Sequence, residues 1–410
     1  MGGYILKVCL AAQNQVVAKT KHLYGDEIWG IVSLCSLFLF LDACYIFVLG
    51  GTSADNGNNN CLNTTAKYNV PFNGIDYRNS TPTGRASNGL ILPDYVGAHV
   101  SLCLVIFLSA AFLLLGEFSY VILPARRLNR TESPRPIICL IRSSDEYKRA
   151  ILTEGGTLAS ASSGIFDTTG RPRFGEVIQV LPLRTQVKFF GEVYEDLIDL
   201  QGRQAAASLI RRSLFIVSTG SSDIADQLDR HPISDSFFIT AVIAQYVGLL
   251  RSLYAYEARK FAIVAPLLIG CNPSSRAENA TGGGRCNQRG TSLTLDFVES
   301  LATALRRLRV LYPDFQYSIC NAPNFLLDVN ANPGSFPACG ISEVRDACCG
   351  NGTMPCRPTS TLCGNREQYL YWNQYQLTQE GSRILTAACF SSNLRYAAPI
   401  NFYQLARTTT

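Results

Sequence analysis

Short apolar runs, each followed by a polar turn, are the feature that most constrains the fold of this chain. They are YIFVL (45–49), SLFIVS (213–218) and KFAIVA (260–265). Stretches of helical length lie between and after them, such as 236–256, where apolar residues recur at helical spacing. Wholly apolar strands that alternate with helices are typical of a parallel sheet covered on both faces. We therefore predict an α/β protein whose functional site lies at the carboxyl ends of the strands.

The charge of the chain is small and spread out. Of 410 residues, 47% are apolar and 16% are charged, and the formal net charge is +5. No run of Lys and Arg concentrates that charge, so the sequence gives no indication of nucleic-acid binding. The sequence contains three histidines, His22, His99 and His231, which limits any mechanism that needs an imidazole base.

Cysteines and glycosylation acceptors indicate an oxidising compartment. The chain has 15 cysteines, and seven of them lie between Cys320 and Cys389. Asn-x-Ser/Thr acceptors occur at Asn63, Asn79, Asn129, Asn279 and Asn351. This combination predicts a protein of the secretory pathway that is extracellular or membrane-associated.

Two sets of cysteines are predicted to form disulfides. Cys271 and Cys286 should pair across a short loop. In a second group, Cys348 or Cys349 should pair with Cys356 or Cys363. These four could instead be zinc ligands, but no C-x-x-C pair or nearby histidine supports that interpretation. We therefore predict no metal and no cofactor.

Two apolar runs raise the question of membrane association. Residues 28–41 are uncharged and of signal-peptide length, so residues 1–43 are interpreted as a leader with a signal peptide, or alternatively with an uncleaved anchor. Residues 100–124 contain one charge in 25 and precede three arginines, a pattern typical of a stop-transfer helix. That topology would place the cysteine-rich end in the cytosol, which conflicts with the oxidising compartment indicated by the cysteines and glycosylation acceptors. We interpret residues 99–149 as an apolar insertion, either a transmembrane or membrane-lying helix or a retained non-coding stretch of the gene.

The polar turns resemble the sequence blocks of the plant-type GDSL esterase/lipases, a branch of the SGNH hydrolases. FVLGGTSADNGNNN (47–60) is similar to the opening block, in which Gly-Asp-Ser-Leu precedes Asp-Asn-Gly-Asn-Asn. The further blocks follow in order: GIDY (74–77), PTGRASNG (82–89), LASASSGIFDTTG (158–170), STGSSD (218–223), ARKFAIVAPLLIGCNP (258–273), DACCGNG (346–352), LCGNREQYLYWNQYQLT (362–378) and PINFYQLA (399–406). The resemblance implies one domain, built from 44–98 and 150–410. Its implied fold is a three-layer α/β/α sandwich of the SGNH, flavodoxin-like kind, with a mainly parallel five-stranded sheet.

The resemblance also implies a chemistry, acyl transfer from an ester to water. In the family, a serine at the first turn attacks the ester, a histidine near the C-terminus is the base, and an aspartate three residues earlier orients the histidine. On this chain those positions are Thr52, Gln376 and Asn373. A glycine N–H and an asparagine side chain of the family's oxyanion site fall at Ala161 and Ser222.

None of these five positions holds the family's residue, and Gly51 stands where aspartate precedes the serine. The amide of Gln376 cannot accept a proton at neutral pH, and the extra methyl of Thr52 crowds the attack. Ser53 could replace Thr52 only if the turn shifted by one residue. We predict a GDSL relative that is catalytically weak or inactive and binds a small acyl ester, of lipid or cell-wall type, or a glycan. The alternatives are an active ester hydrolase with Thr52 as nucleophile, and a membrane-anchored protein held by residues 100–124.

Overall fold

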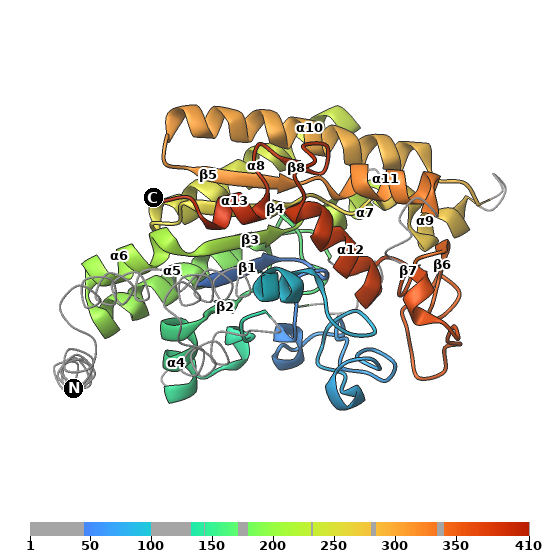
Figure 1. The fold of residues 1–410 in the computed structure, drawn as a ribbon, viewed down its shortest axis with the longest axis horizontal. Helices are drawn as coiled ribbons and strands as arrows, with labels where there is room; N and C mark the ends of the chain where they lie inside the picture. Colours follow the sequence, from blue (N-terminus) through green and yellow to red (C-terminus); the bar gives the residue numbers. More distant parts are fainter. Residues whose placement is uncertain are drawn as a thin grey trace, which may run out of the picture.

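A mainly parallel sheet organises the protein in the computed structural model, which describes residues 45–99, 133–142, 144–170, 179–230, 233–279, 284–333 and 340–409. Within these residues the strand order is β2-β1-β3-β4-β5-β8 (Figure 1). The strands are β1 (Ile46–Gly50), β2 (Gly155–Thr157), β3 (Leu214–Ser218), β4 (Lys260–Val264), β5 (Gln316–Cys320) and β8 (Ala397–Ala398). The first five are parallel, as predicted, and β8 adds a short antiparallel edge. The resemblance implied five strands, and the sixth, β8, is two alanines long and carries no strand pattern.

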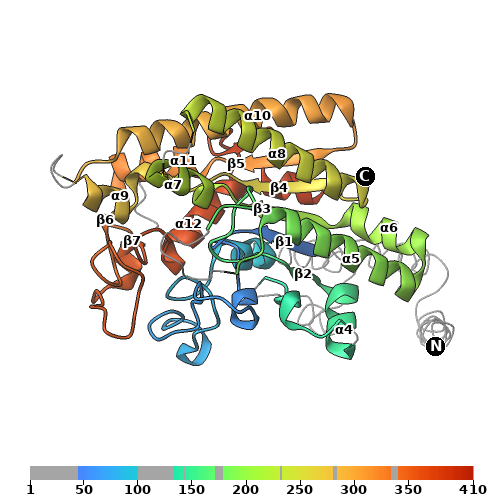
Figure 2. The same ribbon diagram turned by 180° about the vertical axis from the view of Figure 1, so that it is seen from behind.

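Helices cover both faces of the sheet (Figures 1 and 2). One layer contains α4 (Asp145–Thr153), α5 (Leu183–Gln201), α6 (Arg203–Arg212), α8 (Asp235–Ala255) and α10 (Gln288–Leu311). The other contains the helical residues 92–99 with α11 (Ala322–Ala331), α12 (Gln379–Phe390) and α13 (Phe402–Ala406). At the carboxyl ends of the strands lie α7 (Ser221–Arg230), η4 (Ile269–Cys271), α9 (Pro273–Glu278), and the pair β6 (Glu343–Ala347) and β7 (Tyr369–Tyr371). Short 3-10 turns complete the chain: η1 (Asn58–Cys61), η2 (Arg78–Ser80), η3 (Ile137–Cys139) and η8 (Arg366–Gln368).

Each strand sends alternate side chains into the two helical layers. In β1, Phe47 and Leu49 belong to the core on the α5 side, and Ile46 and Val48 belong to the core on the α12 side. All four are buried. Burial on both faces explains why the parallel strands are continuous apolar runs and could be predicted from sequence.

The apolar insertion ends earlier than the sequence predicted. Residues 100–132 lie outside the described residues, and the membrane-segment prediction for 100–124 stays a prediction. Residues 133–149, however, belong to the α/β domain, since Cys139 forms a disulfide with Cys61 and Tyr147 is buried against the α5 layer. Sequence reasoning missed α4, although Ser144 is a typical N-cap residue and is followed by Asp145 and Glu146 in the first turn.

Five disulfides join the described residues, which indicates a protein of the secretory pathway. Cys271 pairs with Cys286, as predicted. The pairs Cys348–Cys363 and Cys349–Cys356 confirm the prediction for the second group and occupy the four thiols considered as zinc ligands. The pairs Cys61–Cys139 and Cys320–Cys389 were not predicted.

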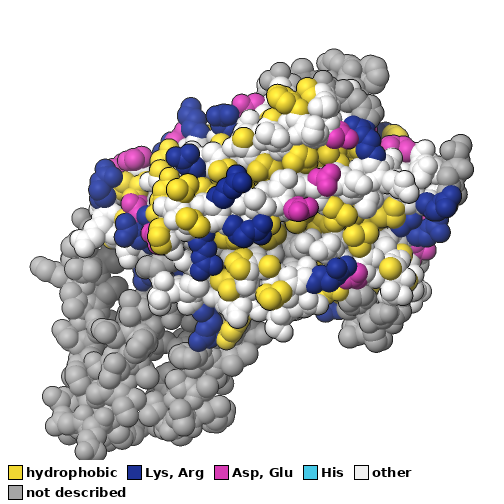
Figure 3. All heavy atoms as spheres, turned by 90° about the horizontal axis from the view of Figure 1, so that it is seen from above, with side chains coloured by type: hydrophobic (Ala, Val, Ile, Leu, Met, Phe, Trp, Pro, Cys, Tyr) yellow, Lys and Arg dark blue, Asp and Glu magenta, His cyan; other side chains and the backbone are white. Residues whose placement is uncertain are grey.

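Among the described residues, α8 is the one helix whose length and hydropathy would let it cross a membrane. Its Phe238, Val242 and Leu250 are buried in the core, so we assign it to the helical layer. The outer face on the α10 side shows apolar stripes between Lys and Arg side chains (Figure 3). The proposed leader run 28–41 lies outside the described residues.

Candidate functional site

The turn after β1 is fixed by the backbone of its neighbours. Gly50 ends the strand with φ +137, and a Cβ at this position would overlap the carbonyl oxygen of Ser218 on β3. The side-chain amide of Gln186 accepts from the Gly50 N–H at 2.8 Å and donates to the Gly50 carbonyl at 2.9 Å. These contacts place Thr52 at the carboxyl end of a strand inside the sheet, where the sequence predicted the site.

Three segments meet at Thr52. The threonine side chain is buried, and its Oγ1 accepts the backbone N–H of Ser162, from the loop after β2, at 2.9 Å. Ser222, at the start of α7, has its Oγ 4.0 Å from the point that a Cβ of Gly51 would occupy. Ser162 has φ +64, a backbone conformation that non-glycine residues rarely adopt. The structure therefore gathers the first-turn, second-block and third-block positions at one edge of the sheet.

The backbone donor that faces Thr52 is one residue beyond the predicted one. The N–H of Ala161 donates to Asp55 Oδ2 at 2.9 Å, so it is directed to the interior of the turn. The N–H of Ser162 is the group directed at Thr52 Oγ1. Sequence reasoning did not single out Ser162, because its left-handed conformation, the signal that could have marked it, is visible only in the backbone.

Asp55 is a buried carboxyl beneath this turn. Removal from water raises its pKa to about 6, although the backbone N–H groups that it accepts lower it in part. Asp94 is equally buried, but there Arg85 outweighs the desolvation and lowers the pKa of the carboxyl through charge and two hydrogen bonds of 2.8 and 2.9 Å. The two aspartates differ because only Asp94 has a cationic partner in contact.

The 373–377 loop, which belongs to the 362–378 block, is folded around an asparagine side chain. Asn373 is 2% exposed, and its Oδ1 accepts the backbone N–H groups of Tyr375 at 3.0 Å and Gln376 at 2.9 Å. Its second side-chain group is an NH₂, which is a donor and cannot accept a proton from an imidazole. Within the described residues, no hydrogen bond joins Thr52 to Gln376.

Tyr68 is a further hydroxyl near the turn after β1. Burial, together with the neighbouring Tyr375 and Asp55, raises its pKa to about 12, whereas a hydrogen bond with the Ser162 side chain acts in the opposite direction. The Tyr68 hydroxyl therefore adjoins Ser162, the residue whose N–H faces Thr52 Oγ1.

His99 lies away from this edge. Its ring stacks on Phe390 at 4.7 Å, and its Nδ1 is 2.8 Å from the Tyr95 carbonyl oxygen. Phe390 ends α12, a helix of 12 residues that is about 18 Å long at 1.5 Å per residue, and the 373–377 loop precedes the other end of this helix. His22 and His231 lie outside the described residues. Among the described residues, no group of three or more His, Cys, Asp or Glu could hold a metal ion.

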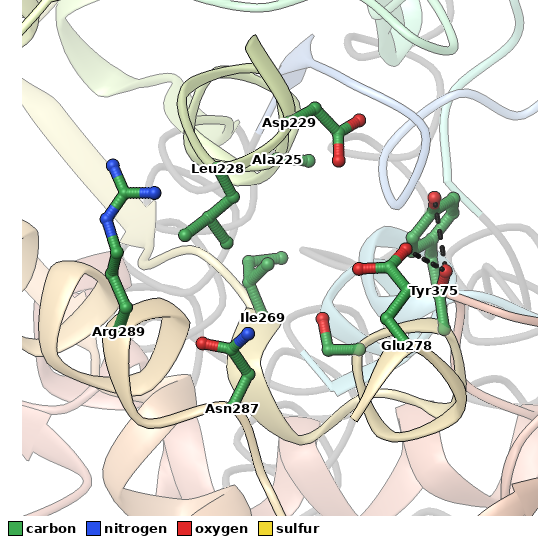
Figure 4. Close-up of a pocket in the computed structure, with 10 residues that line it drawn as sticks. Ala225, Leu228, Asp229, Ile269, Glu278, Asn287, Arg289 and Tyr375 are labelled. Carbon is green, nitrogen blue, oxygen red and sulfur yellow. Dashed lines mark hydrogen bonds between the residues drawn. The ribbon is translucent and has the colours of Figure 1, made fainter. Parts of the chain in front are cut away.

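A cavity of about 240 Å³ adjoins the loop. Side chains from α7, α9 and the start of α10 line it, and Tyr375 forms its wall on the side of the loop (Figure 4). Its lining is largely polar and includes Asp229, Glu278 and Arg289. Sequence reasoning did not predict it, because its residues come from segments that carry no motif.

Comparison with known proteins gives a consistent family. No protein-family model matches the chain. The GDSL esterase/lipase At4g28780 of Arabidopsis thaliana is 28% identical over 365 residues, which cover 87% of this chain and 88% of the relative. Two further GDSL esterase/lipases of the same plant are each 27% identical. The similarity to At5g55050 covers 88% of this chain and 90% of that relative. The similarity to At4g16230 covers 92% of this chain and 98% of that relative. The chain is therefore similar along nearly its whole length to plant GDSL esterase/lipases, and its mainly parallel sheet is consistent with the fold of the SGNH hydrolases.

Proposed function

We propose that this chain is a ligand-binding member of the family whose hydrolytic activity is weak or absent. The observation that carries the proposal is the state of Thr52: its Oγ1 accepts the N–H of Ser162, and none of its hydrogen bonds reaches a base. The relatives are named esterase/lipases, so an acyl ester is the ligand class that we transfer to this chain. A glycan is the second ligand class that we propose for this chain.

The proposed roles follow the family positions. Thr52 occupies the place of the nucleophile, and Gln376 and Asn373 occupy the places of the base and its orienting acid. A hydroxyl attacks an ester only if its proton is removed, and an amide cannot remove it. Loss of a triad base costs about 10⁶-fold in kcat in a well-studied serine protease. We therefore expect turnover close to the uncatalysed rate.

Ester recognition depends less on the replaced side chains. A backbone N–H binds a carbonyl oxygen whatever its side chain, and Ser162 presents its N–H at Thr52. We propose that Ser162, rather than Ala161, supplies the backbone donor to the ester carbonyl, with Ser222 beside it. Loss of one donor in a working oxyanion site costs about 10²–10³-fold in rate, so the exchange of asparagine for Ser222 adds to the expected loss of activity.

We further propose that residues 1–43 form a leader that directs the chain into the secretory pathway. The five disulfides support this placement. Residues 28–41 and 100–124 are the segments that we propose for membrane association. Carbonate extraction of membranes from the producing cells tests the second part, since a protein without a membrane-embedded segment is released.

Equilibrium dialysis against p-nitrophenyl octanoate tests the function directly. We expect saturable binding with the ester recovered intact, and loss of binding in Thr52→Trp, which fills the space in front of Ser162. Folding of that variant is checked by its melting temperature. Rapid release of p-nitrophenol, abolished by Thr52→Ala, would instead establish a threonine hydrolase. Absence of saturable binding by the unaltered chain would reject the ligand-binding proposal.

A further inference from the structure

The polar cavity beside the 373–377 loop contains hydrogen-bonding groups that are only partly satisfied. The Ser274 hydroxyl lies 3.4 Å from Glu278 Oε1 and 3.5 Å from the Tyr375 hydroxyl oxygen (Figure 4). Both contacts are long, and one hydroxyl proton cannot serve both at once. Among the described residues, the Glu278 side chain has no other hydrogen bond. Gln374, next to Tyr375, keeps a buried side-chain oxygen without a partner.

The charge of the cavity selects against anions. Asp229 and Glu278 contribute two carboxylates, and Glu278 faces Tyr375 in Figure 4. The guanidinium of Arg289, on the opposite side, is bound by both oxygens of Asp235 at 2.6 and 2.8 Å, so its charge is already compensated. Glu278 accepts only the long contact from Ser274 among the described residues, so a free fatty-acid carboxylate or a phosphate would meet its negative charge here.

The lining also distinguishes a neutral ligand from a cation. Recognition of a quaternary ammonium uses several aromatic faces, and Tyr375 is the one aromatic side chain in this lining. Hydroxyl groups, in contrast, can donate to the carboxylates and accept from Ser274 and Tyr375. Leu228 and Ile269 supply a small apolar surface for the C–H groups of such a ligand.

The size of the cavity restricts it to one small group. Its volume of about 240 Å³ is below the roughly 300–1,000 Å³ of ordinary ligand pockets and equals the space of about eight water molecules. A single sugar ring or a small polyol matches this volume, whereas an extended acyl chain does not match either its size or its polar lining.

The position of the cavity relates it to the proposed ester site. Ala225, which lines the cavity, and Ser222, which lies beside the turn after β1, are three residues apart on α7 and so lie on one face of that helix. We infer that the cavity binds the alcohol part of the ester, and that this part is a neutral polyhydroxylated group, a sugar or a polyol. This inference rests on the proposed function, because it assigns the second half of the same ligand.

Three octanoate esters test the inference by equilibrium dialysis: 6-O-octanoyl-glucose, methyl octanoate and octanoylcholine. They share the acyl chain and differ in the alcohol. We expect the glucose ester to bind the unaltered chain at least about tenfold more tightly than methyl octanoate, because each added hydrogen bond contributes a factor of roughly 2 to 13. Tighter binding of octanoylcholine than of the glucose ester would overturn the assignment to a neutral group.

Two variants locate the preference. Glu278→Gln and Tyr375→Phe should each weaken binding of the glucose ester about 3- to 10-fold and leave methyl octanoate unchanged. Glu299→Gln, an exposed carboxylate in the α10 part of another surface groove, is the matched control and should change neither. Equal binding of glucose and methyl esters, or a preference untouched by both variants, would overturn the inference. Failure of every ester to bind would instead count against the proposed function and the inference that rests on it.

Discussion

The turn after β1 and the 373–377 loop, which carry the residues of the proposed site, are built differently. The turn is held by contacts between residues far apart in the sequence. The Gln186 side chain, for example, is hydrogen-bonded to both the N–H and the carbonyl oxygen of Gly50. The loop is held mainly by its own residues, with Asn373 accepting two N–H groups within three positions. Tyr375 in that loop is 39% exposed, whereas Thr52 is 9% exposed. The conformation of the turn at Thr52 is therefore set by the sheet, and that of the 373–377 loop by local hydrogen bonds.

The largest expected effect comes from restoring the family's residues in both regions together. Thr52→Ser, Asn373→Asp and Gln376→His combined should raise ester hydrolysis by at least about 10²-fold over the unaltered chain, because the three groups act as a unit. Thr52→Ser alone should leave the rate unchanged within error, since no base is present. Initial rates with p-nitrophenyl butyrate measure both. If the single variant gains as much as the triple variant, the loop does not hold the position of the base.

The second effect concerns the rigidity of the turn. Gly50→Ala should destabilise the protein by about 3 kcal/mol or more, because alanine is strained at φ +137 and its Cβ overlaps Ser218. Gly364, in the 362–378 block, has open space around its Cβ position and an ordinary φ, so Gly364→Ala is the matched control and should change stability by less than about 1 kcal/mol. Chemical unfolding measures both. Similar losses in the two variants would remove the distinction between the regions.

A smaller effect should separate the two side-chain acceptors. Asn373→Ala leaves two backbone N–H groups without a partner, and Thr52→Val leaves one. An unsatisfied buried donor costs about 1–3 kcal/mol, so Asn373→Ala should be the more destabilising of the pair. Thermal unfolding compares them. The reverse order would mean that the loop relaxes to satisfy its own backbone and is less fixed than its hydrogen bonds indicate.

The smallest effect is a pH dependence of stability in the turn. The pKa of Asp55 in the folded state, about 6, lies above the ordinary value of 3.8. Between these values the folded state binds more protons than the unfolded state, so the contribution of Asp55 to the free energy of unfolding decreases as the pH rises from about 4 to about 6. The stability difference between the unaltered protein and Asp55→Asn should therefore fall over that range. The pKa of Asp94 is lowered in the folded state. The difference in free energy of unfolding between the unaltered protein and Asp94→Asn should therefore fall as the pH drops below about 4. Urea unfolding at pH values from about 2.5 to 7 checks both signs, and a rising Asp55 difference would show that its N–H bonds outweigh its burial.

The two regions also differ in how far sequence could predict them. The strands were predictable because two-sided burial makes them continuous apolar runs, and the turn followed from the block after β1. The direction of the Ser162 N–H was not predictable, because it depends on a left-handed residue in a loop that meets the turn across the sheet. The Cys61–Cys139 pair was missed because the two cysteines are 78 positions apart and Cys139 was assigned to the insertion and not to the sheet domain. The cavity at Tyr375 joins α7, α9 and α10, which no local pattern connects.

Covalent labelling with a fluorophosphonate tests the central claim most directly, because the reagent reacts only with a hydroxyl that a base activates. The intact mass of the purified chain should remain unchanged, while the triple variant Thr52→Ser, Asn373→Asp, Gln376→His should gain one adduct on the peptide that contains residue 52. That result would place a family scaffold around a site that has lost its activated hydroxyl. A stoichiometric adduct on Thr52 of the unaltered chain would contradict the account and establish a working threonine nucleophile.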